Sequence, residues 1–155
     1  MSFHRAAMII AVLFGTSACV SASSDNYALP LNGAVKASVS SDGVTLEAKG
    51  PKRVLASMTG KVISVKKAKD GTRTLVMDHG GGMRTVYAQL SHVSAARGED
   101  VRRGRTIGWI GEKGSDASEL RFAMKVGEAK IAPLEVIDTK KVKVTIEEIA
   151  LASAQ

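Results

Sequence analysis

Few side chains in this sequence could hold a catalytic metal ion. It contains three histidines and one cysteine, and His4 lies in the apolar N-terminal stretch. The other two, His79 and His92, belong to no H-x-H or H-x-x-x-D spacing. A catalytic zinc ion needs about three protein ligands and one open position. We therefore predict no metal, no cofactor and no catalytic residue, with both histidines in structural roles and His79 at a turn contact.

The single cysteine follows a stretch with the features of an export signal. Arg5 precedes an apolar run from Ala6 to Phe14, and small residues come next. The run is shorter than the roughly 20 residues of a membrane span. A lone cysteine cannot form an internal disulfide, and the position of Cys19 resembles the lipidation site of bacterial lipoproteins. Cleavage after Ala22, which would give a soluble exported protein, is the alternative.

These features predict how the N-terminal part of the chain is organised. Residues 1–18 are expected to be the signal and residues 19–28 a tether. Lipidation at Cys19 would anchor the protein to a membrane. Some bacteria sort lipoproteins by the residue that follows the lipidated cysteine, and an Asp there favours the inner membrane. This residue is Val20, which favours the outer membrane.

Composition and charge limit what the rest can be. A chain of 155 residues suffices for one domain. Its hydrophobic fraction of 45% allows a core, but aromatic residues make up only 4%, so the core must be mainly aliphatic. Most aromatic residues are expected inside, which disfavours sugar stacking. The net charge of +7 favours anionic partners such as teichoic acids, lipid headgroups or acidic protein surfaces, unless it is simply a solvated basic surface.

Short β-prone runs separated by turn residues continue along the chain. Ala34–Ser40 and Val44–Ala48 flank an Asp-Gly pair, which is a strong hairpin signal. The remaining strands are expected at Arg53–Ser57, Gly60–Val65, Leu75–Met77, Thr85–Leu90, Thr106–Gly111 and Leu120–Val126, with a polar loop at Glu112–Ser118. This pattern predicts an all-β fold, a small barrel or sandwich of antiparallel strands.

The end of the chain allows two interpretations. Lys140–Glu147 alternates apolar and polar residues and could add an edge strand, whereas Glu147–Ala154 could form a short helix. We expect the domain to span residues 29–137 and residues 138–155 to form a tail.

The order of several motifs resembles the lysostaphin/LytM-type zinc endopeptidases of bacterial cell walls. Val86–Ser91 (VYAQLS) is similar to their TVYAHLS segment, and Val101–Gly111 to their V-x-x-G-x-x-I-G-x-x-G signature. Leu120-Arg121-Phe122 is similar to their H-L-H-F-E strand, and Gly43 falls within their H-x-G-x-D motif. The resemblance covers about residues 29–137.

The departures from the family motifs fall on the catalytic positions. The resemblance places three zinc ligands at Ser41, Thr45 and Arg121, and two further active-site histidines at Gln89 and Glu119. Hydroxyl groups are poor neutral zinc ligands, and Arg121 puts a permanent cation where the metal would sit. We therefore expect these five residues to line a partner-binding groove, with Glu119 and Arg121 on one strand face at i, i+2.

This pattern resembles the degenerate LytM factors of bacterial envelopes, several of which activate N-acetylmuramoyl-L-alanine amidases. The resemblance implies a non-enzymatic factor of the envelope, periplasmic and lipid-anchored, that regulates peptidoglycan hydrolysis in cell division or wall remodelling. Its expected partner is such an amidase or another wall hydrolase, and no nucleic acid. The alternatives are a peptidoglycan-binding structural lipoprotein and a hydrolase that borrows a metal ligand from a partner.

Overall fold

The described chain is built from strands alone, as the sequence predicts. The computed structural model describes residues 27–33, 35–131 and 144–146, the last as a strand without its side chains. Within this part no helix is long and apolar enough to cross a membrane. The strands are β1 (Val35–Ser40), β2 (Gly43–Lys49), β3 (Lys52–Leu55), β4 (Gly60–Lys67), β5 (Arg73–Asp78), β6 (Met83–Leu90), β7 (His92–Val93), β8 (Asp100–Val101), β9 (Thr106–Ile110), β10 (Ala117–Val126), β11 (Ala129–Ile131) and β12 (Val144–Ile146).

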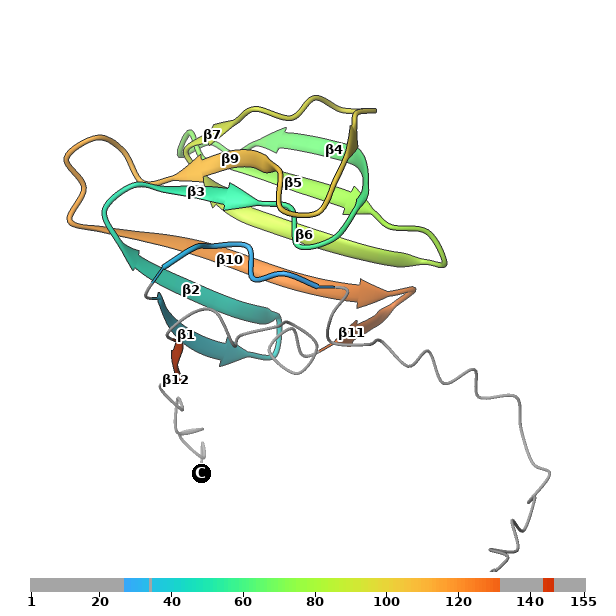
Figure 1. The fold of residues 1–155 in the computed structure, drawn as a ribbon, viewed down its shortest axis with the longest axis horizontal. Coiled ribbons are helices and arrows are strands. Elements are labelled where there is room, and N and C mark those ends of the chain that lie inside the picture. Colours follow the sequence, from blue (N-terminus) through green and yellow to red (C-terminus); the bar gives the residue numbers. More distant parts are fainter. Residues whose placement is uncertain (1–26, 34, 132–143, 147–155) are drawn as a thin grey trace, which may run out of the picture.

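The strands form two sheets that pack against each other (Figure 1). The large sheet has the order β12-β1-β2-β10-β6-β5-β4-β8, with β11 paired to the end of β10. The small sheet has the order β3-β9-β7. All described pairings are antiparallel except that of β1 with β12, which is parallel. An all-β antiparallel fold is thus confirmed.

The core lies between the two sheets and is mainly aliphatic. On β10, Leu120, Phe122 and Met124 are buried and Arg121 is exposed, which is the alternation that the sequence predicts. Tyr87 of β6 is fully buried, and its ring lies 5.2 Å from that of Phe122. These strands therefore turn alternate side chains towards the core and towards the outer face of the large sheet.

The expected loop at Glu112–Ser118 is shorter than predicted. The structure begins β10 at Ala117, so the strand has ten residues. Ser118 is buried, and its hydroxyl donates a hydrogen bond to the Gly50 carbonyl at 2.6 Å. A buried polar side chain is tolerated in a strand when it forms a hydrogen bond with the backbone. A run of polar residues in the sequence does not reveal such a contact between distant residues.

Both ends of the described chain join the sheets. The N-terminal segment 27–33 pairs with β3 through a Leu31–Val54 bridge and buries Tyr27, Leu29 and Leu31. At the other end, β12 adds an edge strand beside β1, which confirms the edge-strand interpretation for that part of the tail. The helix interpretation for Glu147–Ala154 concerns residues outside the described part.

Candidate partner-binding groove

Three strands of the large sheet bring two of the predicted site residues together. Thr45 of β2 lies directly opposite Arg121 of β10, and Arg121 lies opposite Ala88 of β6. Directly opposed residues point to the same face of a sheet, with Cβ atoms about 4.5–5.5 Å apart. This row faces away from the core, because the alternating neighbours Leu46, Leu120 and Tyr87 are buried.

A depression of about 180 Å³ lies over this row. Its walls are mostly apolar, although Arg121, Thr45 and Asp42 contribute polar groups. It is smaller than the roughly 300–1,000 Å³ of typical small-molecule sites. Such a volume suits one inserted side chain of a larger partner. The lining residues are Ser40, Asp42, Gly43, Val44, Thr45, Val86, Ala88, Arg121, Phe122 and Ala123.

Glu119 and Arg121 lie on one strand face, as their i, i+2 spacing predicts, and they form an ion pair with each other. Arg121 Nε donates a hydrogen bond to Glu119 Oε1 at 3.0 Å, and the Arg121 and Glu119 side chains are 64% and 42% exposed respectively. A pair so open to water contributes about 0–1 kcal/mol to stability. It can therefore rearrange towards a bound partner at little cost.

Gly43 fixes the position of β2 against β10 beside the depression. Its φ of +144° lies in a region that favours glycine, and a Cβ there would be 2.4 Å from the Phe122 carbonyl oxygen. The two backbones approach so closely only because this residue has no side chain. The glycine kept from the family motif is therefore required by packing.

Gln89 occupies a strained position at a β-bulge. Its φ of +69° is the only positive value among the described non-glycine residues. Between the β5–β6 pairs Leu75–Tyr87 and Arg73–Leu90, Ala88 and Gln89 together oppose the single residue Thr74. The adjacent Ala88, rather than Gln89, lines the depression.

Ser41 lies at the edge of the site rather than in it. It is exposed in the β1–β2 turn and lines a neighbouring depression together with Asp42 and Lys130. Lys130 forms an ion pair with Asp42, and its hydrogen bond, together with its positive charge, lowers the pKa of that carboxyl group. The structure therefore groups Thr45, Glu119 and Arg121, and places Gln89 and Ser41 at the border.

The residues present on this row do not fit a zinc centre. Thr45 offers a neutral hydroxyl and Arg121 offers only donors, whereas zinc binds thiolate, imidazole and carboxylate groups. Within residues 27–33 and 35–131 no three His, Cys, Asp or Glu side chains gather where they could hold a metal ion. The chemistry of this surface is that of hydrogen bonds and apolar contact.

His79 and Tyr87 belong to a hydrogen-bonded network on the core side of the same strands. His79 Nδ1 lies 2.8 Å from the Thr59 carbonyl oxygen, and its Nε2 lies 2.7 Å from Thr85 Oγ1. Tyr87 OH lies 3.3 Å from Thr85 Oγ1 and 2.8 Å from Ser57 Oγ, and it accepts the Ser57 N–H at 3.0 Å. The predicted turn contact of His79 is confirmed.

Burial shifts the acid–base behaviour of this network. It lowers the pKa of His79, although the hydrogen bond to Thr59 partly opposes the shift. It also raises the pKa of the Tyr87 phenol. Both shifts favour neutral side chains, which suits a structural network.

The two packed sheets define an all-β sandwich, and comparison with known proteins identifies the family. Residues 39–133 match peptidase family M23, and the chain belongs to this family. The DD-carboxypeptidase/endopeptidase Mpg of Neisseria meningitidis is 38% identical over 85 residues, which are 54% of this chain and 19% of that protein. Stage II sporulation protein Q of Bacillus subtilis is 28% identical over 103 residues, 63% of this chain and 36% of that protein. The match thus spans about a fifth to a third of these relatives.

Solved structures show the same fold. The SpoIIQ–SpoIIIAH pore-forming complex contains a chain with a TM-score of 0.62 and 24% identity, covering 73% of this chain and 91% of that chain. Another crystal structure of the SpoIIIAH and SpoIIQ complex gives a TM-score of 0.53 and 27% identity, over 60% and 68% of the two chains. Lysostaphin of Staphylococcus simulans gives a TM-score of 0.53 and 25% identity, over 63% and 43%.

Sequence reasoning missed the apolar floor of the groove. Val86, Ala88 and Ala123 line the depression but carry no chemistry that a motif search would notice. Their signal was present in the two-residue period of the strands, because each is an outward neighbour of a buried residue. Outward positions beside Arg121 could have been assigned once the order of strands was known.

Proposed function

We propose that this protein is an exported, non-enzymatic member of peptidase family M23 that binds a protein partner through the groove around Arg121. The observation that carries the proposal is the Thr45–Arg121–Ala88 row beside an apolar depression of about 180 Å³. An arginine takes the place of a metal ligand, and the space next to it fits a side chain.

The chemistry of the groove indicates the kind of segment that would bind. An aliphatic side chain would fill the depression, and a neighbouring carboxylate would pair with Arg121 in place of Glu119. The strands that form the floor hold it rigid, so little ordering entropy is lost on docking. SpoIIQ, a family relative, was itself solved in a complex with another protein.

The partner class that we propose is an N-acetylmuramoyl-L-alanine amidase or another wall hydrolase, which the protein would regulate. This assignment rests on the resemblance to LytM factors, together with the export signal and Cys19. We propose that the protein acts in the envelope, periplasmic and lipid-anchored to the outer membrane.

The test is an assay of sacculus digestion by a purified amidase of the same cell, with and without this protein. We expect the protein to raise the amidase rate, and we expect Arg121→Ala to abolish the increase. Arg84→Ala is the matched control, because Arg84 is an exposed, ion-paired arginine on β6 that does not line the depression. Equal loss with both variants would contradict a role for the groove.

Two further arms separate the rival functions. A hydrolase would release muropeptides without any amidase, and a chelator would stop the release. A purely structural wall binder would sediment with sacculi but leave amidase rates unchanged. Either result would replace the proposed function.

A further inference from the structure

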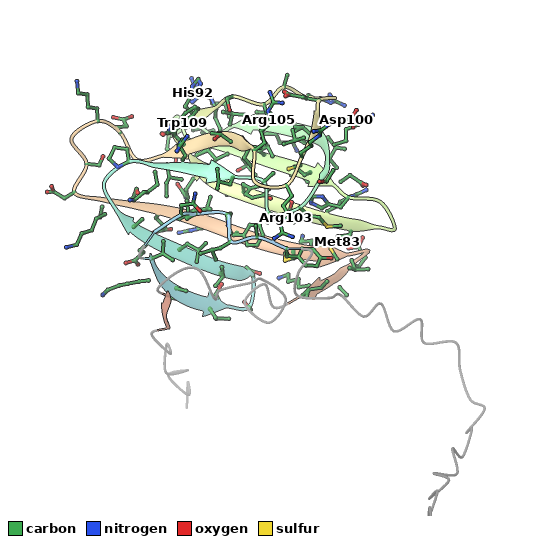
Figure 2. The ribbon with its side chains drawn as sticks, viewed as in Figure 1. Met83, His92, Asp100, Arg103, Arg105 and Trp109 are labelled. Carbon is green, nitrogen blue, oxygen red and sulfur yellow. The ribbon has the colours of Figure 1, made fainter. Side chains whose placement is uncertain are left out.

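The only tryptophan of the chain lies on the outer face of the small sheet. Its strand neighbours Ile107 and Ile110 are fully buried, whereas Trp109 is half-buried. Its ring centroid lies 5.6 Å from that of the exposed His92, at an interplanar angle of 48°. Figure 2 shows the two residues side by side at this sheet. Most described aromatic residues lie in the core as expected, namely Tyr27, Tyr87 and Phe122, and Trp109 is the exception.

The residues beside Trp109 form a row across the small sheet. Arg53 of β3 and His92 of β7 lie directly opposite Trp109 from its two sides. All three thus share one face, a guanidinium group and an imidazole flanking the indole. Arg53 is exposed and forms no ion pair with any described residue. We call Arg53, His92, Trp109 and the nearby Lys113 the tryptophan platform.

A broad, shallow depression of about 530 Å³ lies over one side of this platform. This volume is within the roughly 300–1,000 Å³ of small-molecule sites and about three times that of the groove depression. Glu112 is the single acid among its described lining residues. The platform carries two cations, Arg53 and Lys113, so positive charge exceeds negative charge here. The lining residues are Pro51, Ser91, His92, Trp109, Gly111, Glu112 and Lys113.

We propose that the tryptophan platform binds a sugar ring of an anionic glycan, namely a wall glycan strand whose amino sugars carry carboxyl groups. A pyranose presents one flat face of C–H bonds, which packs on an indole, and hydroxyl groups at its edge. Trp109 supplies an apolar body with a polar edge, and His92 can donate or accept a hydrogen bond from a hydroxyl group. Arg53 and Lys113 supply the positive charge that a carboxylate requires.

This site is separate from the groove. The inner side of β9 packs against β6 and β10, so Trp109 and Arg121 lie on opposite outer faces with the core between them. One molecule can therefore hold a glycan on one face and a protein partner on the other. The proposal does not depend on which protein occupies the groove.

The single tryptophan makes the proposal directly testable. Tryptophan fluorescence of the purified chain, excited at a wavelength that tyrosine does not absorb, reports on Trp109 alone. We expect a saturable change when peptide-free wall glycan strands, which carry muramic carboxylates, are added. Neutral chitin oligosaccharides of matched length should bind about threefold to tenfold more weakly, because they lack the carboxylate. Absence of a saturable change with wall glycan would overturn the proposal.

Variants test the platform by retention on immobilised wall glycan. Trp109→Ala should weaken retention roughly tenfold or more, and Trp109→Phe less, because a smaller aromatic face remains. Arg53→Gln changes an exposed side chain and should weaken retention about threefold without lowering the melting temperature. Arg84→Ala is the matched control, because Arg84 is an exposed arginine that lines neither depression, and it should bind glycan as the unchanged chain does.

Three results would contradict the assignment. Unchanged retention with both Trp109→Phe and Arg53→Gln would place the glycan elsewhere. Loss of retention with Arg121→Ala alone would place the glycan in the groove. Binding of a DNA oligonucleotide or polyphosphate as tight as that of wall glycan would show a general polyanion surface. Because the amidase assay depends on Arg121 and glycan retention on Trp109, failure of one proposal is distinguishable from failure of the other.

Discussion

The two sides of β6 use their side chains in opposite ways. Thr85 and Tyr87 point into the core and join the network with His79 and Ser57. No described buried side-chain nitrogen or oxygen lacks a hydrogen-bond partner. Val86 and Ala88, one residue further along in each case, point outward and line the groove depression. The polar groups on the core side are all hydrogen-bonded and stabilise the fold. The outward side chains remain available to bind another molecule.

This difference implies that the two sides respond differently to substitution. Changes on the core side should lower the free energy of unfolding, because they leave buried groups unpaired. Changes on the groove side should alter binding and leave stability nearly intact. The variants below test this separation.

Substitution of Gly43 should have the largest effect, because this residue lines the groove depression and also fixes the packing of β2 against β10. In Gly43→Ala the new Cβ would meet the Phe122 carbonyl oxygen at 2.4 Å, at a φ of +144°. We expect the free energy of unfolding to fall by about 2–4 kcal/mol, measured by urea denaturation. Gly71→Ala, at a φ of +89° with open space around it, is the control and should cost less. Similar losses in both variants would remove the special role of the close approach.

Tyr87→Phe tests the core side alone. Loss of the hydroxyl leaves the Ser57 N–H without its partner in a fully buried place. The expected destabilisation is about 1–3 kcal/mol in urea denaturation. The groove should remain intact, so amidase activation should persist at temperatures at which the variant is folded. A loss of activation by a folded Tyr87→Phe protein would show that the two sides are coupled.

His79 should make stability depend on pH in a defined direction. Its folded-state pKa is lowered from the ordinary 6.5, so the unfolded chain takes up a proton first as the pH falls. Stability is therefore fully present above about pH 6.5 and declines as the pH falls towards the folded pKa, with a slope of at most about 1.4 kcal/mol per pH unit. Comparison of His79→Gln with the unchanged chain by urea denaturation at several pH values should show a shallower slope in the variant. An identical slope would mean that another group titrates.

Arg121→Ala should have the smallest effect on stability. The Arg121–Glu119 pair is largely exposed, so its removal should change the free energy of unfolding by about 0.5 kcal/mol or less. The same variant should lose amidase activation. Unfolding of Arg121→Ala would contradict the view that the outer row contributes little to the free energy of unfolding.

Much of the fold could be predicted because turn and strand signals are local. The Asp42-Gly43 pair marks a hairpin that the structure contains between β1 and β2. The alternation on β10 also placed Glu119 and Arg121 on one face, and the contact between their side chains agrees with this prediction. The recurring strand and turn signals predicted the all-β class, which the two sheets confirm, and the match to peptidase family M23 confirms the family that the motifs indicated.

The remainder depended on contacts between distant residues. The groove floor needs the pairing of β2, β10 and β6, which no local pattern specifies. Trp109 is the exception among the described aromatic residues, and its outward position follows from the pairing of β9 with β3 and β7, which no local pattern specifies. The β3–β9 register shift next to Leu55 breaks the simple alternation of that sheet, and a bulge of this kind is hard to detect in sequence.

The close contact of Gly43 with the strand beside it has a consequence for how fast a partner can associate. Because β2 cannot slide along β10, the groove has a single shape, and binding requires no prior opening of the groove. Association should then be limited by diffusion and orientation, with rate constants of about 10⁵–10⁷ M⁻¹s⁻¹. Differences in affinity among partner sequences should appear in how long each complex survives.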